Sequence, residues 1–280
     1  MYGRPEDLGQ ALRSLAAGPA LVVAGGTDVY PARVGRPPGE GLLDLSRLAS
    51  LRGVEAGPEA WRIGALTTWS DLARAGLPPA LHALAQAAVE VGGPQVQNRG
   101  TVGGNLCNAS PAADGVPVLL ALDARVELAS VRGVRTLALS DFVLGPRRTA
   151  LAADELLVAV RVPRRGAGAR SRFVKLGHRR YLVISIAMVA VAVDVDDAGC
   201  VTHAGVAVGA CSAAACRLPA LEAALLGTPR ARLAEAGRRA LRDPVALAPL
   251  APIDDLRGTA RYRLDAAATL VGRALGELAA

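Results

Sequence analysis

Two glycine-rich segments, about 75 residues apart, constrain this chain more than any other feature of its sequence. Adjacent glycines let backbone N–H groups approach an anion and point at it together. Two such segments suit the two halves of one pyrophosphate, which predicts a dinucleotide cofactor. No G-x-G-x-x-G run typical of a Rossmann fold accompanies them. The segments read Val23-Ala24-Gly25-Gly26-Thr27-Asp28-Val29 and Thr101-Val102-Gly103-Gly104-Asn105, the second continuing through Cys107 and Asn108 to Pro111.

The first segment follows a short apolar strand expected at residues 21–24. Most glycine pairs serve tight turns that need a positive φ, so Gly25-Gly26 alone is compatible with a purely structural role. Thr27 favours binding, because a hydroxyl beside a glycine turn is a natural donor to phosphate. Asp28 is expected to cap the loop or to accept from a sugar hydroxyl, with a plain turn residue as the alternative.

The second segment is more specific, because it offers a hydroxyl, two unhindered backbone N–H groups and an amide within five positions. Polar residues and Pro111 follow it, which predicts irregular backbone. The apolar run 116–122 comes next, so we expect this loop to enter the core. Cys107, inside the segment, is expected to be a small buried filler rather than a nucleophile.

Amino-acid composition limits which classes of protein this chain can belong to. The 280 residues are 51% hydrophobic and 20% charged, which fits a folded protein with room for two domains. The net charge of +7 invites a nucleic-acid interpretation, but the basic residues are scattered and aromatic residues make up only 3%. A basic face for an acidic partner subunit stays open. Lys175 is the only lysine, which favours a tight polar site that suits a compact ammonium, with a chance occurrence as the alternative.

The cysteines, the first ten residues and the longest apolar run indicate the cellular compartment in which the protein is expected. Four cysteines match neither a zinc nor an iron–sulfur spacing, and reduced thiols in a cytoplasmic protein are expected. Charged residues interrupt the first ten positions, so no secretory signal is expected. The apolar run 181–193 is too short to span a bilayer, and we expect a buried strand there instead.

The pattern of apolar residues and turn signals predicts an α+β fold. Residues 163–172, rich in arginine and glycine, form the best domain boundary, and Asp196-Asp197-Ala198-Gly199 predicts a hairpin turn. Thr68 or Ser70 is expected to cap a helix. Helices are expected at 5–15, 68–75, 81–91, 218–226, 229–242 and 256–278, and strands at 21–24, 41–45, 61–65, 125–128, 136–139, 155–162 and on both sides of the hairpin turn.

Further motifs stand in order along the chain: Arg4-Pro5, residues 24–28, Ile63-Gly64-Ala65, residues 101–114, Lys175 to Arg180 leading to Ile184-Ser185, and Ala260 to Arg263. Together they resemble the FAD-binding medium subunits of the molybdenum hydroxylases, a family that includes bacterial xanthine dehydrogenases and aerobic carbon monoxide dehydrogenases. The resemblance covers the full length of the chain. It implies an FAD-binding domain of the p-cresol methylhydroxylase/vanillyl-alcohol oxidase type at 1–165, with subdomains of about 1–53 and 54–165. A smaller α+β carbon monoxide dehydrogenase flavoprotein-like C-terminal domain, an antiparallel sheet with helices, is implied at 170–280.

The resemblance also assigns roles to residues. Both glycine segments would hold the FAD pyrophosphate. Asp114 would accept hydrogen bonds from cofactor hydroxyls, Leu157 would lie against the cofactor, and Lys175 would contact the flavin side. Phe173 and Tyr181 would lie near the isoalloxazine. No catalytic side chain and no metal ligand is expected in this chain, because the redox chemistry belongs to the cofactor.

The implied partners are a molybdopterin-binding large subunit, which hydroxylates the substrate, and a small subunit with two 2Fe–2S clusters. Electrons would pass from these clusters through FAD to an external acceptor, and the expected assembly is a dimer of heterotrimers without nucleic acid or a membrane span. Two alternatives stay open: a stand-alone flavin oxidoreductase of the same fold, and a binding module that has lost its flavin.

Two departures from the family pattern matter. The 4-hydroxybenzoyl-CoA reductase branch carries an extra iron–sulfur cluster on an inserted loop. Here Cys107 is the only cysteine before residue 200, which disfavours that branch. The family often has an aspartate before the Ile-Ser pair, where this chain has Val183, so the contacts expected around Ser185 are in question.

Overall fold

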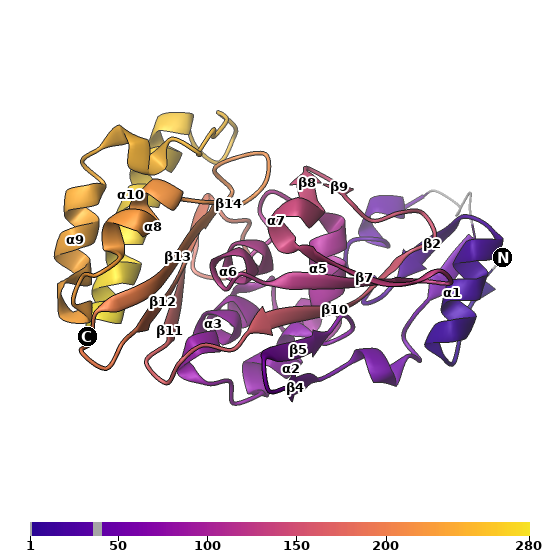
Figure 1. Ribbon diagram of the computed structural model, residues 1–280. Coiled ribbons are helices and arrows are strands. Elements are labelled where there is room, and N and C mark those ends of the chain that lie inside the picture. Colours follow the sequence, from indigo (N-terminus) through magenta and orange to yellow (C-terminus); the bar gives the residue numbers. More distant parts are fainter. Residues whose placement is uncertain (1, 36–40) are drawn as a thin grey trace.

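The computed structural model describes residues 2–35 and 41–280, and places three sheets side by side along the molecule (Figure 1). The first is a three-stranded parallel sheet, the second a five-stranded antiparallel sheet, and the third a four-stranded antiparallel sheet. The two chain ends lie at opposite ends of this row (Figure 1). The expected α+β class, with an antiparallel C-terminal sheet covered by helices, is confirmed.

The N-terminal sheet has the order β1-β3-β2, with β1 at Tyr2–Gly3, β2 at Ala20–Val23 and β3 at Gly41–Asp44. Helix α1 (Leu8–Ala17) begins later than the predicted residue 5, because the Asp7 side chain accepts from the N–H of Gln10 and so caps the helix. The leucines of α1 pack with Leu156 and Val158 of β10 in a small core of their own. This core fixes the end of β2, where the first glycine segment starts.

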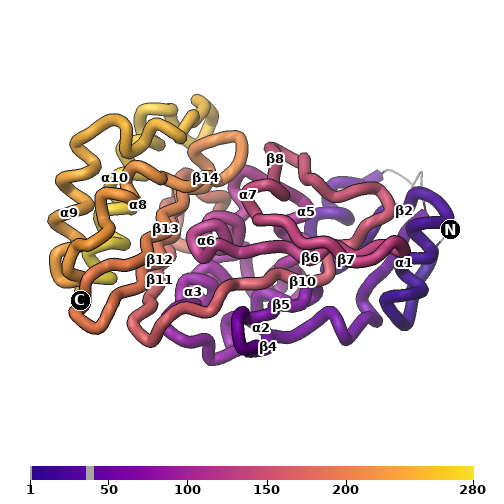
Figure 2. The backbone as a smooth tube through the Cα atoms, in the orientation of Figure 1, coloured from indigo at the N-terminus to yellow at the C-terminus, as the bar shows by residue number. Residues whose placement is uncertain are grey.

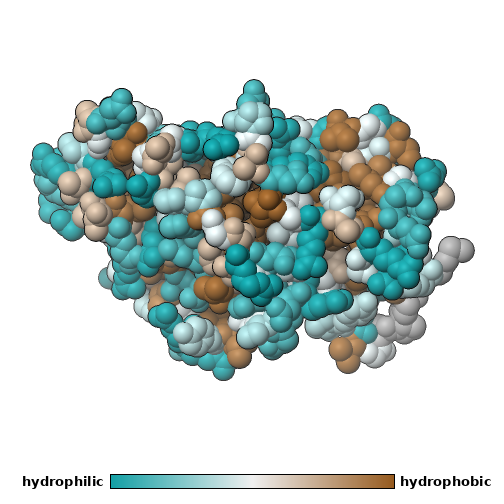
Figure 3. All heavy atoms as spheres, turned by 90° about the horizontal axis from the view of Figure 1, so that it is seen from below, coloured by the Kyte–Doolittle hydropathy of each residue, from teal (hydrophilic) through white to brown (hydrophobic). Residues whose placement is uncertain are grey.

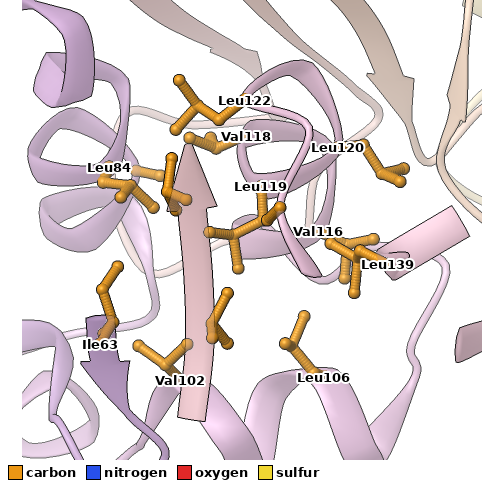
Figure 4. Close-up of a cluster of buried hydrophobic side chains, with 14 of the residues drawn as sticks. Ile63, Leu84, Val102, Leu106, Val116, Val118, Leu119, Leu120, Leu122 and Leu139 are labelled. Carbon is orange, nitrogen blue, oxygen red and sulfur yellow. The ribbon is translucent and has the colours of Figure 1, made fainter. Parts of the chain in front are cut away.

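The middle sheet has the order β4-β5-β10-β6-β7 and is covered by short helices. Its apolar face packs against α3, α5 and α6, and Figure 4 shows Leu84, Leu106 and Leu119 of these helices turned toward one another. The strands are β4 (Val54–Ala56), β5 (Ala60–Gly64), β6 (Arg125–Ser130), β7 (Gly133–Ala138) and β10 (Leu156–Pro163), and a separate pair is β8 (Val143–Gly145) with β9 (Arg148–Thr149). The helices are α2 (Trp69–Arg74), α3 (His82–Glu90), α4 (Pro94–Gln97), α5 (Val102–Asn108), α6 (Gly115–Ala121) and α7 (Leu139–Phe142).

The backbone crosses to the third sheet through residues 164–169, between β10 and β11 (Figure 2). That sheet has the order β11-β12-β13-β14, and its outer face is covered by three helices (Figure 1). Its elements are β11 (Arg170–Leu176), β12 (Ala187–Val195), β13 (Val201–Gly209), β14 (Cys216–Arg217), α8 (Pro219–Leu225), α9 (Leu233–Ala240) and α10 (Ala260–Ala279).

Strand β12 is buried on both faces. Its successive side chains point alternately into the core of the middle sheet and into the core of the C-terminal helices. Val189, Val191 and Val193 face α8, α9 and α10, while Met188 and Ala190 face the helices of the middle sheet. A strand covered on both sides reads as a continuous apolar run instead of an alternating one. This explains why residues 187–193 contain no charged side chain.

Several sequence predictions are confirmed and others are wrong. Thr68 caps α2 through a reciprocal capping box with Asp71, and residues 196–199 form the hairpin turn with Gly199 at φ 76°. The second glycine segment was expected to be a loop, but it forms α5, since Thr101 supplies a helix cap. The run 181–193 is a strand only from Ala187, and Tyr181 before it is 63% exposed.

The surface shows hydrophobic residues in separate patches among hydrophilic ones on the face seen from below, the widest toward the N-terminal end (Figure 3). Among the residues that the structure describes, no helix is both long enough and apolar enough to cross a membrane.

Asp123 joins the third sheet to the end of α6. Its backbone has a φ of 53°, its Oδ1 accepts from Arg217 Nη1 at 2.6 Å, and its Oδ2 lies 3.1 Å from His203 Nε2 and pairs with Arg165. Burial alone would raise the pKa of Asp123, but the close approach of His203 and the hydrogen bond from Arg217 outweigh it and hold that pKa at about 2. The ionised carboxylate therefore stabilises this joint.

We expect Asp123→Asn to lower the free energy of unfolding by about 1–2 kcal/mol at neutral pH. A pKa depressed to about 2 corresponds to about 2.5 kcal/mol, reduced here because the side chain is 35% exposed. Because the folded pKa is lowered, this stability is present above pH ~4 and disappears as the pH falls toward ~2. Urea unfolding at several pH values measures the difference between wild type and variant.

The matched control is Asp141→Asn, since Asp141 is exposed and takes part in no ion pair within the described part of the chain. A loss of stability in Asp123→Asn that stayed constant from pH 7 to pH 2 would contradict the electrostatic origin.

Candidate functional site

The first glycine segment leaves the sheet at the end of β2 and presents its backbone to a cavity. Gly26 has a φ of 75°, and its carbonyl accepts from the N–H of Tyr30 at 3.1 Å. Within the described part of the chain, the backbone N–H groups of residues 25–29 donate no hydrogen bond. Five consecutive free donors form the kind of backbone nest that binds an anionic oxygen.

The second segment is the start of a helix, and this changes which of its groups are free. Gly103 N–H donates to Ala65 O at 2.8 Å, and Gly104 N–H donates to Thr101 Oγ1 at 3.0 Å. The expectation of two unhindered N–H groups here is therefore wrong, because these donors hold α5 in place. The segment's free polar group is a side-chain atom: Asn105 Oδ1 is buried and has no hydrogen-bond partner among the described residues.

The two segments meet at Gly25. A Cβ atom built on this residue would lie 1.8 Å from the carbonyl oxygen of Arg99 and 3.1 Å from the Cα of Gly100. The backbone of the first segment thus lies directly on the residues that lead into the second. Only glycine permits this approach, and it brings the segments, 75 positions apart, to the walls of one cavity.

The cavity has a volume of about 300 Å³, and both glycine segments line it. Eleven of the fifteen residues predicted from the sequence are among its walls: Ala24, Gly25, Gly26, Thr27, Asp28, Val29, Thr101, Gly103, Gly104, Asn105 and Leu157. Of the other four, Val23 and Val102 belong to the segments but are buried in the core, and Asp114 and Lys175 lie elsewhere.

Asp114 and Lys175 contact each other, and neither is among the residues that line the cavity. Lys175 Nζ donates to Asp114 Oδ2 at 2.8 Å and to Glu90 O at 3.0 Å, and Ser185 Oγ donates to Asp114 Oδ1 at 2.7 Å. Burial raises the pKa of Asp114, and the Lys175 ammonium opposes that rise. The tight polar site expected for the only lysine is present. Ser185 has a carboxylate partner, Asp114, although Val183 precedes the Ile184-Ser185 pair where the family often has an aspartate. A contact of Asp114 or Lys175 with the cofactor stays a prediction.

The apolar walls were missed by sequence reasoning. Their residues come from segments far apart in the chain, and the sequence pattern around each one is typical of the hydrophobic core. They are Leu45, Leu66, Trp69, Val91, Val96, Leu151 and Leu156. Asn108 also lines the cavity, and its place in the polar stretch after Gly104 was the one available signal. Cys107 lines it too, and burial raises the pKa of its thiol to about 12, which agrees with an unreactive filler. Phe173 is buried in the core and Tyr181 is exposed, so neither position tests a contact with isoalloxazine.

Comparison with known proteins decides the family. Residues 1–165 match the FAD-binding domain of molybdopterin dehydrogenases, and residues 172–278 match the C-terminal domain of the CO dehydrogenase flavoprotein. The chain belongs to the FAD-binding medium subunits of the molybdenum hydroxylases. These are oxidoreductase flavoprotein subunits, and the cofactor of the family is FAD.

Relatives of this medium subunit match over most of their length. The carbon monoxide dehydrogenase medium chain of Hydrogenophaga pseudoflava is 32% identical over 281 residues, 98% of this chain and 95% of the relative. The nicotinate dehydrogenase FAD-subunit of Eubacterium barkeri is 38% identical over 75% of this chain and 73% of its own. A solved structure of the Hydrogenophaga pseudoflava carbon monoxide dehydrogenase has a TM-score of 0.87 at 34% identity, covering 99% of this chain and 96% of that one.

The described residues of the medium subunit fit FAD. The free N–H groups of residues 25–29 suit phosphate oxygens, and the unpartnered Asn105 Oδ1 suits a hydroxyl or N–H of the cofactor. The leucine, valine and tryptophan side chains of the cavity suit flat rings. Polar donors and apolar walls therefore occur in the combination that a flavin dinucleotide needs.

We expect Gly25→Ala to lower the free energy of unfolding by about 2–3 kcal/mol, because its Cβ would force the two glycine segments apart. Urea denaturation of the purified chain measures the change. The control is Gly18→Ala, since a Cβ at Gly18 meets no atom within 4 Å and its φ of 164° is extended. Equal stability of the two variants would contradict the close approach at Gly25.

Proposed function

We propose that this chain is the FAD-binding electron-transfer subunit of a heteromeric molybdenum hydroxylase. It would pass electrons from the 2Fe–2S clusters of a partner subunit through FAD to an external acceptor. The observation that carries this proposal is the run of five free backbone N–H groups in a segment that lines the same cavity as the second glycine segment. Relatives named as medium chains or FAD subunits support it.

In this proposal the chain's own residues bind and orient, and bound FAD supplies the redox chemistry. The backbone of residues 25–29 holds phosphate oxygens, since no lysine or arginine is among the described residues that line the cavity. Asn105 Oδ1 fixes orientation by accepting one hydrogen bond. The apolar side chains that line the cavity exclude water from the rings.

The proposed partners are a molybdopterin-binding large subunit and a 2Fe–2S small subunit, assembled as a dimer of heterotrimers. Relatives are described as the medium chain or subunit of carbon monoxide dehydrogenase and of nicotine 6-hydroxylase, which supports a complex of several chains. We further propose a cytoplasmic location, since the four cysteines are free thiols.

Co-expression with the two partner genes and affinity purification of this chain test the assembly. The expected result is co-elution of three subunits in equal amounts, at the mass of two heterotrimers. Elution of the chain alone as an active oxidase of small organic substrates would instead support the stand-alone flavin enzyme.

We expect Gly104→Val to weaken FAD binding at least ~10-fold, because the branched side chain narrows the cavity wall that faces the phosphates. A Cβ at Gly104 would lie 2.9 Å from Thr101 Oγ1 and meets no other atom within 4 Å, so the capping hydroxyl of α5 must shift while the rest of the fold is not crowded. The measurement is flavin absorbance retained after incubation with FAD and desalting, with circular dichroism to check folding.

The control for this experiment is Gly272→Val in α10, where a Cβ meets nothing within 4 Å. Unchanged flavin content in Gly104→Val would count against the second segment as part of the FAD site. A wild-type chain that retained no flavin, alone or in the complex, would support the flavin-less binding module.

A further inference from the structure

A chain of hydrogen bonds joins the two glycine segments at the exposed edge of the proposed FAD cavity. Asn108 Nδ2 donates to Asp28 Oδ1 at 2.9 Å, and Arg147 Nη1 donates to Asn108 Oδ1. Asp28 and Asn108 both line the cavity, and they belong to the two different glycine segments, 80 positions apart. Asp28 and Arg147 are exposed, so this bridge lies where the cavity meets solvent and not at its buried floor.

The chemistry of the three groups fixes the direction of the bridge. Arginine only donates and an ionised aspartate only accepts, so the amide between them must turn its oxygen to Arg147 and its nitrogen to Asp28. Reversal of the amide would place N–H against guanidinium and oxygen against carboxylate. Asn108 therefore connects a cation to an anion across the opening, with a charge at each end of the bridge.

Arg147 is itself held in an uncommon conformation. It lies in the connection between β8 and β9 with a φ of 58°, and its backbone N–H donates to Ala109 O at 3.0 Å. Ala109 ends α5 with a φ of 44°. A non-glycine residue with positive φ persists where its surroundings hold it, and these contacts pin the β8–β9 turn to the end of α5.

We propose that Asp28, Asn108 and Arg147 form a latch over the mouth of the FAD cavity, and that this latch sets the rate of FAD exchange. The inference rests on the proposed function, which places FAD in this cavity. A bond that joins the two walls of an opening must break whenever a ligand passes, in either direction. Asn108 and Arg147 act as positioning residues here, through the loop that carries Asp28.

The proposed latch and an ordinary contact with FAD differ in their expected effects on the rates of FAD association and dissociation. Because the same bonds close the cavity before and after binding, their loss speeds entry and exit alike and leaves the affinity nearly unchanged. A residue that merely contacts FAD changes the dissociation rate and the affinity together. The two roles are therefore separated by measuring both rates.

The experiment uses the full chain and FAD itself as the probe. The variants are Arg147→Gly, which keeps the left-handed backbone, and Asn108→Ala, with Arg148→Ala as the matched control. Within the described part of the chain, the Arg148 side chain makes no hydrogen bond or ion pair. The change in FAD fluorescence on mixing gives the association rate, and the loss of bound flavin after dilution gives the dissociation rate.

We expect both rates to rise about fivefold to tenfold in Arg147→Gly and Asn108→Ala. The Kd of Arg147→Gly should stay within about twofold of wild type, because Arg147 is not among the residues that line the cavity. Arg148→Ala should match wild type in both rates. Unchanged rates in the two latch variants would overturn the latch, as would a faster dissociation matched by a proportional loss of affinity. Both of these outcomes leave FAD binding by the wild type intact. A wild-type chain that binds no FAD would overturn the proposed function and the latch with it.

Discussion

The close approach of two backbones at Gly25 is the constraint on which the site depends. Here the first glycine segment lies against the carbonyl of Arg99, at a distance that no side chain allows. The contact brings two sequence-distant stretches together in the lining of one cavity. It also divides their roles: the second segment uses its own N–H groups to build and anchor a short helix, while those of the first stay free. The free backbone N–H groups at the cavity therefore come from the first segment.

The rest of the fold holds those walls in place through two strands, β10 and β12, each of which is packed on both of its faces. Strand β10 packs α1 on one side and the helices of the middle sheet on the other. Strand β12 does the same between the middle helices and the C-terminal ones. The C-terminal sheet is therefore continuous with the core under the cavity, and the ionic joint at Asp123 ties its edge to α6.

The sequence predicted best what neighbouring residues decide. The Thr68 cap, the turn at 196–199 and the long C-terminal helix all follow from local signals, and eleven predicted residues meet at the cavity. The helix at the second glycine segment was missed, because two glycines argue against a helix unless a cap such as Thr101 is given weight. The apolar walls and the pairing of Asp114 with Lys175 depend on contacts between distant segments, which no local pattern encodes.

The ion pair of Lys175 has a consequence for the chemistry of the whole surface. The chain's one lysine is only 5% exposed in its side chain and bonds to Asp114 and Glu90. Every exposed basic side chain is therefore an arginine or a histidine. A folded molecule of this kind offers amine-directed reagents, acetylating enzymes and lysine cross-linkers no side chain to attack. Reaction at Lys175 would report instead that the pair has opened and the junction around it has come apart.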